Sequence, residues 1–325
     1  MRKITVTTPG KLIITGEHSV VYGCPALAVP AHLNVTGILE FTELETIQFQ
    51  TSLGLSSFAL NGLQVFRSMI GARYQAYLDH EISVKEVLPK PEALLFFTVA
   101  TFQNQYHVRR GIRILLDSKI PIGAGMGSSA AVIVTILALL YDAFEIAHSQ
   151  EELLSLAKQC ENLQHGQSSG LDIAVTGSKS PILYSNATIL PFKPSGFSIY
   201  VVQTGIPTSS TGDCVDFVKS QFNAEFKEEF TKTSNEIIDA LTHKKVKLFK
   251  KAIQENQLLL EKLGVVPDKI IEFRKALHIK YSANFKISGA GSILGDNAGM
   301  GLIVSKSNPK ELCKLYGYKI WEIKI

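Results

Sequence analysis

Residues 121–140, PIGAGMGSSAAVIVTILALL, place three glycines and two serines immediately before a long apolar run. Glycine adopts left-handed backbone conformations without steric penalty, so these glycines allow a tight loop whose backbone N–H groups turn inward. The apolar run predicts a buried helix, with Ser128 or Ser129 as its N-cap. The unpaired N–H groups and the positive dipole end of such a helix would suit a polyphosphate.

The spacing argues against two other phosphate-binding motifs. A dinucleotide-binding fingerprint needs a third glycine where Ser128 stands, and a Walker loop needs a Gly-Lys-Ser/Thr that the chain lacks. A glycine-rich turn before a helix is also common for structural reasons alone. The loop by itself therefore does not decide the function.

The composition is that of a foldable protein with room for two domains. The chain has 325 residues, of which 46% are hydrophobic and 19% are charged. Its net charge of +4 is too balanced to indicate nucleic-acid binding, but it allows a small anionic ligand in a local basic pocket.

The cysteines and the apolar stretches indicate the setting. The four cysteines are widely scattered and form no C-x-x-C pair, so we expect neither a zinc site nor a disulfide framework, and a cytoplasmic location. No apolar stretch is long enough to span a bilayer, and we expect a soluble protein without a membrane partner.

The hydrophobic pattern predicts an α+β fold. A turn at Pro9-Gly10 is expected to end the first strand. Ser149 and Glu152 form a capping box at the start of a further helix. A composition shift predicts a boundary between domains of residues 1–185 and 186–325. The expected strands are 2–7, 12–15, 26–29, 34–41, 111–118, 197–205 and 301–305 with a terminal strand in the tail, and the expected helices are 60–78, 91–106, 128–144, 149–165, several within 213–263, and 268–277.

Two further stretches carry charged groups in apolar surroundings. In residues 9–29, PGKLIITGEHSVVYGCPALAV, Lys11 follows a Pro-Gly turn and the pair Glu17-His18 follows a glycine. Buried charges cost desolvation free energy unless they have partners, and an ion pair on an edge strand is the alternative interpretation. The run from His243, HKKVKLFKKAIQ, is interpreted as the solvated face of an amphipathic helix rather than a binding patch.

The stretch QCENLQHGQSSGLDIAVTG, residues 159–177, offers two carboxylates on different elements. Glu161 and His165 lie four residues apart on one helix face, and Asp172 follows the next turn in an apolar setting. Such a pair suits a division of labour, with one carboxylate on a metal and the other as general base. A helix end followed by a helix start is the structural alternative.

A second glycine-rich stretch, KISGAGSILGDNAGMG at residues 286–301, precedes a buried strand and is equally well interpreted as a hairpin turn. Together, PGKLIITGEHSVVYG, PIGAGMGSSAA and KISGAGSILG resemble, in this order, the three motifs of the GHMP kinases. The resemblance spans nearly the whole chain, and its first two motifs are specific.

The resemblance implies a two-domain fold, with an N-terminal domain like domain 2 of ribosomal protein S5 and a ferredoxin-like C-terminal domain. It also implies an ATP- and Mg²⁺-dependent small-molecule kinase. GEHSVVYG and ENLQHGQSSGLD are most similar to the branch that phosphorylates the primary hydroxyl of mevalonate to 5-phosphomevalonate. A homodimer is a further expectation from the resemblance.

Residue roles follow by position in the matching motifs. Asp172 would be the base and Lys11 would stabilise the forming alkoxide and the transferring phosphoryl group, while Ser129 and Glu161 would hold Mg²⁺. The expected nucleotide contacts are Pro121, Gly123, Ala124, Gly125, Met126, Gly127, Ser128, Ser129 and Ala130. The expected substrate contacts are Lys11, Glu17, His18, Asp172, Thr211, Gly289 and Ala290, with Ser210 as an alternative to Thr211.

Two departures from the family pattern leave alternatives open. The third motif usually continues through consecutive glycines, whereas Ser292, Ile293 and Leu294 stand there in this chain. Ser168 stands where a proline is common. A phosphomevalonate or sugar kinase is therefore an alternative, and so is a non-catalytic nucleotide-binding sensor. A second substrate phosphate would need extra cations, for which the candidates are Arg73, Arg109 and Arg110.

Overall fold

The computed structural model describes residues 3–107, 109–121, 123–166, 168–185 and 188–325. The chain forms two compact units, each assembled from separate stretches. The predicted second domain begins at Asn186, which lies outside the described residues, so that boundary stays a prediction. Unit 1 consists of Met1–Gly10, Leu33–Ile120 and Gly127–Lys179, and unit 2 consists of Lys11–His32, Pro121–Met126 and Ser180–Ile325.

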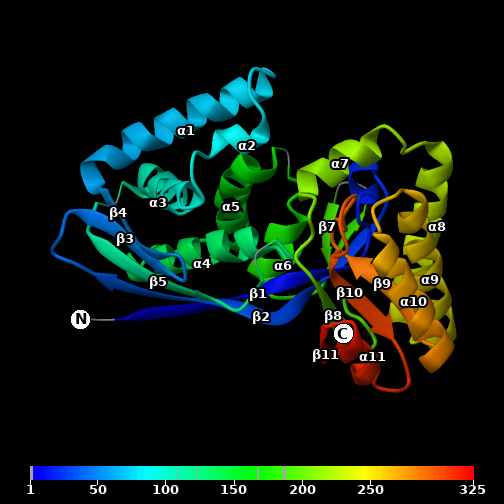
Figure 1. Cartoon of the computed structure of the whole chain (residues 1–325). Helices are drawn as coiled ribbons and strands as arrows, with labels where there is room; N and C mark the ends of the chain where they lie inside the picture. The colour runs from blue at the N-terminus through cyan, green and yellow to red at the C-terminus, as the bar shows by residue number, and fades with distance from the viewer. Residues whose placement is uncertain (1–2, 108, 122, 167, 186–187) are drawn as a thin grey trace. The chain divides into compact units, whose positions relative to one another are not determined.

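Unit 1 places a group of helices on one side of a twisted sheet (Figure 1). The strand order is β4-β3-β5-β2, where β2 spans Ala26–Phe41, with β3 and β5 parallel and the other two pairs antiparallel. Helices α3 and α4 are apolar on nearly all sides and form the centre of the unit. Its elements are β3 (Thr46–Thr51), β4 (Gly54–Ala59), β5 (Ile112–Ser118), the short 3-10 helix η2 (Leu60–Gly62), α1 (Leu63–Leu78), α2 (Val84–Val87), α3 (Ala93–Tyr106), α4 (Ser128–Ala143), α5 (Gln150–His165) and α6 (Leu171–Ser178).

Unit 2 contains a four-stranded antiparallel sheet of order β11-β8-β10-β9, with α9 and α10 against β9 and with α8 packed on α9 (Figure 1). Every residue of β9 and β10 is buried, so these strands form the middle of the unit. Its elements are η1 (Ser19–Tyr22), β6 (Ile182–Ser185), β7 (Thr188–Pro191), β8 (Ser198–Gly205), α7 (Thr211–Lys219), α8 (Ala224–Thr242), α9 (Val246–Lys262), α10 (Asp268–Tyr281), β9 (Asn284–Ser288), β10 (Gly299–Val304), α11 (Lys310–Leu315) and β11 (Lys319–Lys324).

Two strands are longer than predicted. The expected stop at Pro9-Gly10 is wrong, because β1 runs without interruption over Ile4–Thr15. Proline lacks a backbone N–H, but β1 pairs only with β2 among the described strands, and such an edge strand tolerates the missing donor. The two segments predicted at 26–29 and 34–41 are parts of one strand, β2 (Ala26–Phe41).

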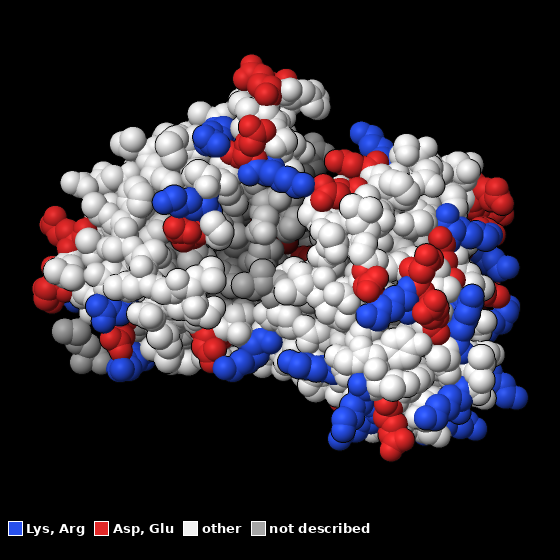
Figure 2. Space-filling view, viewed as in Figure 1, with Lys and Arg blue, Asp and Glu red and all other residues white. Residues whose placement is uncertain are grey.

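The lysine-rich run from His243 forms the start of α9, as predicted. Phe249 and Ile253 are fully buried, while Lys251 pairs with Glu255 at 3.4 Å and Lys245 with Asp239 at 2.9 Å. Positive and negative side chains intermingle over the helices of unit 2 on the face shown in Figure 2. This run is therefore a solvated helix face with local charge pairs.

Two observations bear on the setting of the protein. Within the described ranges, no helix is both long and apolar enough to cross a lipid bilayer. All four cysteines are free and buried. Burial raises the pKa of the Cys160 thiol to about 12, so this thiol is chemically inert at neutral pH.

The capping box of α5 is confirmed and provides a test of the fold. Ser149 Oγ accepts from the Glu152 N–H at 3.1 Å, and the Glu152 carboxylate accepts from the Ser149 N–H at 2.6 Å. We expect Ser149→Ala to lower the free energy of unfolding by about 1 kcal/mol in urea denaturation. The matched control, Ser155→Ala on the exposed face of the same helix, should be neutral or slightly stabilising, and equal losses in both variants would contradict the capping role.

Candidate active site

Three segments that are far apart in the sequence meet within unit 2. The Lys11 N–H donates to the Met126 carbonyl at 2.8 Å. Gly125 and Gly289 pack backbone to backbone, because a Cβ built on either would lie 3.3–3.4 Å from the Cα of the other. The first motif, the loop of the second motif and the start of the third motif are therefore in direct contact.

The loop before α4 has the predicted backbone. Gly123, Gly125 and Gly127 have φ values of 74°, 76° and 64°, all in the left-handed region that favours glycine. Gly127 is the N-cap of α4 and no side chain caps that helix end in the described residues, so the predicted cap at Ser128 or Ser129 is wrong. A helix start without a side-chain cap leaves its first N–H groups to an anion.

The other residues that were expected to contact the nucleotide differ in how far they are buried. Ala124 and Met126 of the loop and Ala130 of α4 are buried, while Ser128 and Ser129, the first residues of α4, are half-buried. Pro121 is half-buried and its carbonyl accepts from the Ala124 N–H at 3.4 Å.

The predicted metal ligands, Ser129 and Glu161, both belong to unit 1. Ser129 Oγ is 3.5 Å from His165 Nε2, and Glu161 lies one turn before His165 on α5. Glu161 is buried, and Ser168 Oγ donates to its carboxylate at 2.5 Å. Ser168 also accepts from the Gly170 N–H at 3.0 Å, so this serine fixes by hydrogen bonds the turn that a proline would fix covalently.

The predicted base, Asp172, lies in the first turn of α6 and is half-buried. The N-cap of this helix is Gly170, whose φ of 80° lets the chain turn sharply after α5. A carboxylate in the first turn is stabilised by the helix dipole. Ser168 thus joins the element that carries Glu161 to the element that carries Asp172.

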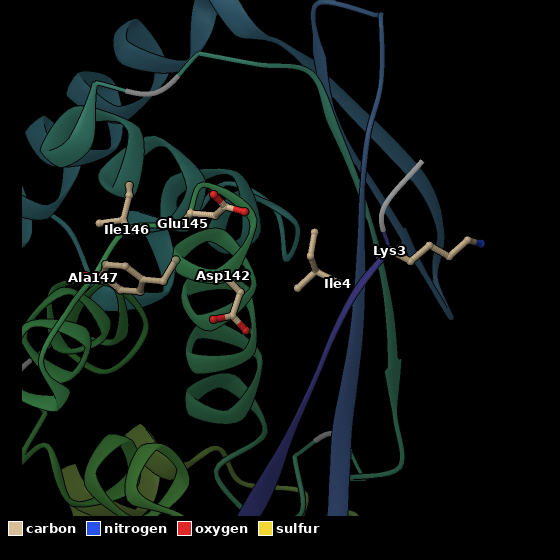
Figure 3. Close-up of a pocket in the computed structure, with 7 residues that line it drawn as sticks. Lys3, Ile4, Asp142, Glu145, Ile146 and Ala147 are labelled. Atoms are coloured by element: carbon tan, nitrogen blue, oxygen red, sulfur yellow. The ribbon is translucent and has the colours of Figure 1, made fainter.

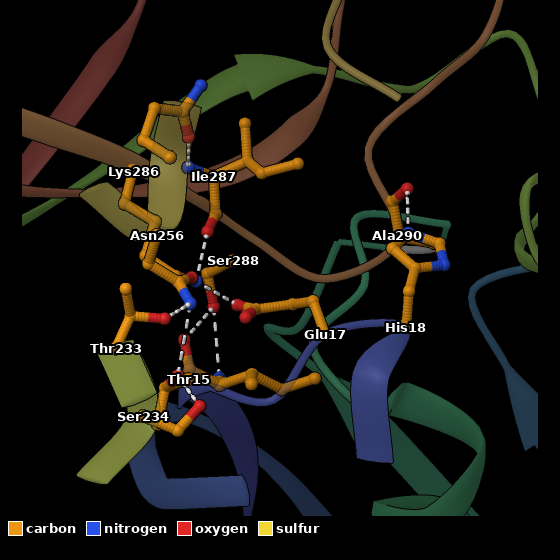
Figure 4. A network of polar contacts seen from close by, with 12 residues as sticks. Thr15, Glu17, His18, Thr233, Ser234, Asn256, Lys286, Ile287, Ser288 and Ala290 are labelled. Carbon is orange, nitrogen blue, oxygen red and sulfur yellow. Dashed lines mark hydrogen bonds and ion pairs between the residues drawn. The ribbon is translucent and has the colours of Figure 1, made fainter. Parts of the chain in front are cut away.

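The predicted substrate-side residues of the first motif face the third motif (Figure 4). Glu17 is buried and its carboxylate forms an ion pair with Lys286, which is fully buried in β9. Lys286 is a residue of the site that was not predicted from the sequence. Its signal was a lysine between the two apolar residues of the strand segment FKI, because a buried charge needs a partner.

His18 occupies a strained position beside this pair. Its φ of 58° lies in the left-handed region, which is uncommon for residues other than glycine. His18 Nε2 lies 2.9 Å from the Ala290 carbonyl oxygen. A carbonyl can only accept, so Nε2 carries the proton, and Nδ1 of the neutral ring is an acceptor. Burial lowers the pKa of His18 below its usual 6.5, and the charge of Lys286 lowers it further.

The third glycine-rich loop, which departs from the family pattern at residues 292–294, forms hydrogen bonds to the segment before α7. Ser292 Oγ accepts from the Ser209 N–H at 3.0 Å, and Ser209 Oγ accepts from the Ile293 N–H at 3.2 Å. Thr211, the predicted substrate contact, is the exposed first residue of α7. Ser210, its alternative, uses its hydroxyl in a capping box with Asp213.

Lys11 is buried, with 5% of its surface exposed. The structure thus gathers Lys11, Glu17, His18, the loop 121–126, Gly289 and Ala290 in unit 2, and Ser129, Glu161 and Asp172 in unit 1.

A surface pocket elsewhere in unit 1 does not fit this chemistry. Figure 3 shows Asp142 in the last turn of α4 and Glu145 just after it, with Lys3 and Ile4, where the first strand begins, on the other side. The C-terminal end of a helix carries the negative end of its dipole, and these carboxylates add to it. The pocket is therefore unsuited to a polyphosphate.

The chain's residues fit ATP and Mg²⁺. The glycines of the loop have left-handed backbone conformations, and the start of α4, which no described side chain caps, supplies N–H donors. Mg²⁺ in kinases takes one or two carboxylates and completes its shell with phosphate and water oxygens. Glu161 and the Ser129 hydroxyl are such a donor set.

The chain is similar to known kinases. Residues 93–179 match the family described as GHMP kinases N terminal domain. The chain is 28% identical over 303 residues to a mevalonate kinase of Pyrococcus horikoshii, covering 90% of this chain and 87% of that protein. The structure of Methanococcus jannaschii mevalonate kinase matches with a TM-score of 0.78 at 21% identity, over 99% of this chain and 98% of that one.

Streptococcus pneumoniae phosphomevalonate kinase, in complex with phosphomevalonate and AMPPNP, matches with a TM-score of 0.77 at 18% identity, over 99% of this chain and 100% of that one. These structural matches confirm the predicted two-domain α+β fold.

The protonation of His18 predicts a pH effect on stability. Because the folded protein keeps His18 neutral, the unfolded chain binds more protons below about pH 6.5, and the stability present above that pH is lost as the pH falls through it. One such group contributes a slope of at most about 1.4 kcal/mol per pH unit. We expect His18→Gln, measured by urea unfolding between pH 7.5 and 5.5, to lose stability less steeply than the wild type.

The control for this measurement is His278→Gln, which changes an exposed histidine of α10 and should keep the wild-type slope. A wild-type slope in His18→Gln would contradict the neutral, buried state of His18.

Proposed function

Because the chain belongs to the GHMP kinase superfamily, we propose that it transfers the γ-phosphoryl group of ATP to the primary hydroxyl of mevalonate, giving 5-phosphomevalonate and ADP. The observation that carries this proposal is the meeting of the three motifs in unit 2, with Gly125 packed on Gly289 and Lys11 bonded to Met126. The similarity to the archaeal mevalonate kinase over nearly the whole chain supports mevalonate as the substrate.

The proposed residue roles follow the chemistry of phosphoryl transfer. Asp172 accepts the proton of the primary hydroxyl as its oxygen forms a bond to the γ-phosphorus, and the bond to the bridging oxygen of ADP breaks. Lys11 stabilises the negative charge on the attacking oxygen and the phosphoryl group. The N–H groups of the glycine loop and of the first turn of α4 bind the nucleotide phosphates.

Mg²⁺, when bound, neutralises charge between the nucleotide phosphates. Ser129 and Glu161 are the proposed ligands. Ser168, through its bond to the Glu161 carboxylate, restricts the orientation of that side chain.

Three arginines were candidates for binding a second phosphate on the substrate. Two of them have other partners in the structure. Arg73 donates to the backbone carbonyls of Glu86 and Val87, and Arg110 stacks over Phe41 at 4.1 Å from the ring centre. This favours mevalonate over phosphomevalonate. A cytoplasmic location, supported by four unpaired cysteines, and a homodimer belong to the same proposal.

The direct test is ADP release by the purified protein from Mg-ATP with mevalonate, phosphomevalonate, galactose or homoserine. We expect turnover with mevalonate alone. Turnover with another compound would contradict the substrate, and no turnover with any of them, together with tight ATP binding, would favour the sensor alternative.

The role of Asp172 predicts a separation of binding from chemistry. Asp172→Asn should reduce kcat with mevalonate by about 10²–10⁴-fold, since general base catalysis contributes that much, and leave the Kd for ATP within a few-fold. The matched control is Asp268→Asn, which changes an exposed aspartate in the first turn of α10 and should leave kcat unchanged. Wild-type turnover in Asp172→Asn would show that another group is the base.

The role of Glu161 predicts a change in metal affinity. Glu161→Gln should weaken Mn²⁺ binding to the ATP complex by about 10-fold or more, measured by electron paramagnetic resonance, because a charged ligand is lost. Glu151→Gln, on an exposed position of the same helix, serves as the control and should bind Mn²⁺ as the wild type does. Equal Mn²⁺ affinity in both variants would exclude Glu161 as a ligand.

A further inference from the structure

Lys286 is buried completely in β9, a strand whose five residues are all buried. Its ammonium group donates to the carboxylate of Glu17 and, at 2.8 Å, to the carbonyl of Ile287 (Figure 4). The two charges are 269 residues apart in the sequence. Neither the phosphate loop nor the predicted base, metal ligands or nucleotide contacts include this lysine.

The pair is poorly explained as a device for stability. Taking two charges out of water costs more free energy than their attraction usually returns, and apolar residues of similar volume are often as stable or more so. The second carboxylate oxygen of Glu17, Oε2, is buried and has no hydrogen-bond partner among the described residues. A half-satisfied carboxylate adds to this cost. The pair does fix the direction and the distance between the segment that carries Glu17 and the segment that carries Lys286.

The neighbouring contacts join the same two segments. Ser288 Oγ donates to the Ile13 carbonyl and accepts from the Ile13 N–H, both at 2.9 Å. Lys286 and Ser288 alternate along β9, so their side chains lie on one face of the strand and meet residues 13–17. Two residues further on, the Ala290 carbonyl accepts from His18. Alternate residues of the third motif, at positions 286, 288 and 290, therefore bind residues within 13–18 of the first motif.

We propose that Lys286 is a positioning residue that holds Glu17, and with it the strained His18, against the third glycine-rich loop. Through these contacts it fixes the substrate-side segment of the site, whereas Glu17 is its ion-pair partner rather than a group in contact with the substrate. This inference rests on the proposed function for its kinetic part. A measurement of how well ordered the first-motif and third-motif segments are in the ligand-free protein tests it independently of activity.

The test compares Lys286→Met, the double variant Glu17→Met/Lys286→Met, and the control Lys306→Met, which changes an exposed lysine beyond β10. Three quantities are measured: the melting temperature, amide hydrogen exchange of the ligand-free protein at residues 13–23 and 286–295, and kcat and KM for mevalonate. The double variant leaves no unpaired buried charge and carries the test if Lys286→Met does not fold.

For Lys286→Met we expect a lower melting temperature, faster exchange in both segments, and a mevalonate KM raised at least tenfold with kcat within about threefold of the wild type. In the double variant the melting temperature should recover by at least half, while the exchange and the KM stay raised. Lys306→Met should match the wild type throughout.

Two results would overturn the positioning role. Unchanged exchange in the folded single or double variant would show that Lys286 does not hold these segments. Recovery of exchange and KM together with the melting temperature in the double variant would show that the pair contributes stability alone. A wild-type protein inactive on mevalonate would refute the proposed function instead, and the exchange data would still decide the role of Lys286.

Discussion

The close approach of two glycine backbones, Gly125 and Gly289, is the constraint on which the rest of unit 2 depends. A side chain at either position would meet the backbone of the other. Both residues also have positive φ values, so other residues would be strained there even with more space. The contact brings the phosphate loop and the third motif to one place, and the bond from Lys11 to Met126 adds the first motif.

Buried polar groups then fix the segments around this contact. Asn256 of α9 donates to Thr15 and Thr233 at 3.4 and 3.3 Å, and Thr15 shares a hydrogen bond of 2.7 Å with Ser234 of α8 (Figure 4). These bonds connect the end of β1 to two helices. Since net hydrogen-bond free energies are small and unmet groups are costly, such a network specifies an arrangement more than it adds stability. The buried pair of Lys286 and Glu17 likewise specifies an arrangement more than it adds stability.

Local signals in the sequence were sufficient for much of the fold. The capping box at Ser149, the apolar helix after the glycine loop and the left-handed glycines were all predictable because each depends on neighbouring residues. The continuation of β1 past Pro9 was not, because it depends on β1 being an edge strand. The hairpin of β3 and β4 was also missed. The pairings of Lys286 with Glu17 and of Ser209 with Ser292 join residues more than 80 positions apart, and no periodicity reports them.

We propose that this chain phosphorylates the primary hydroxyl of mevalonate. The position of the phosphate in the reaction product is the measurement that decides this. Phosphorus NMR of the reaction with Mg-ATP shows the position of the new ester, because a phosphate on a CH₂–O group couples to two protons and one on the tertiary carbon couples to none. We expect a monoester signal split into a triplet, with one ADP formed per ester. An unsplit monoester signal, or ADP formed without any new ester, would contradict it.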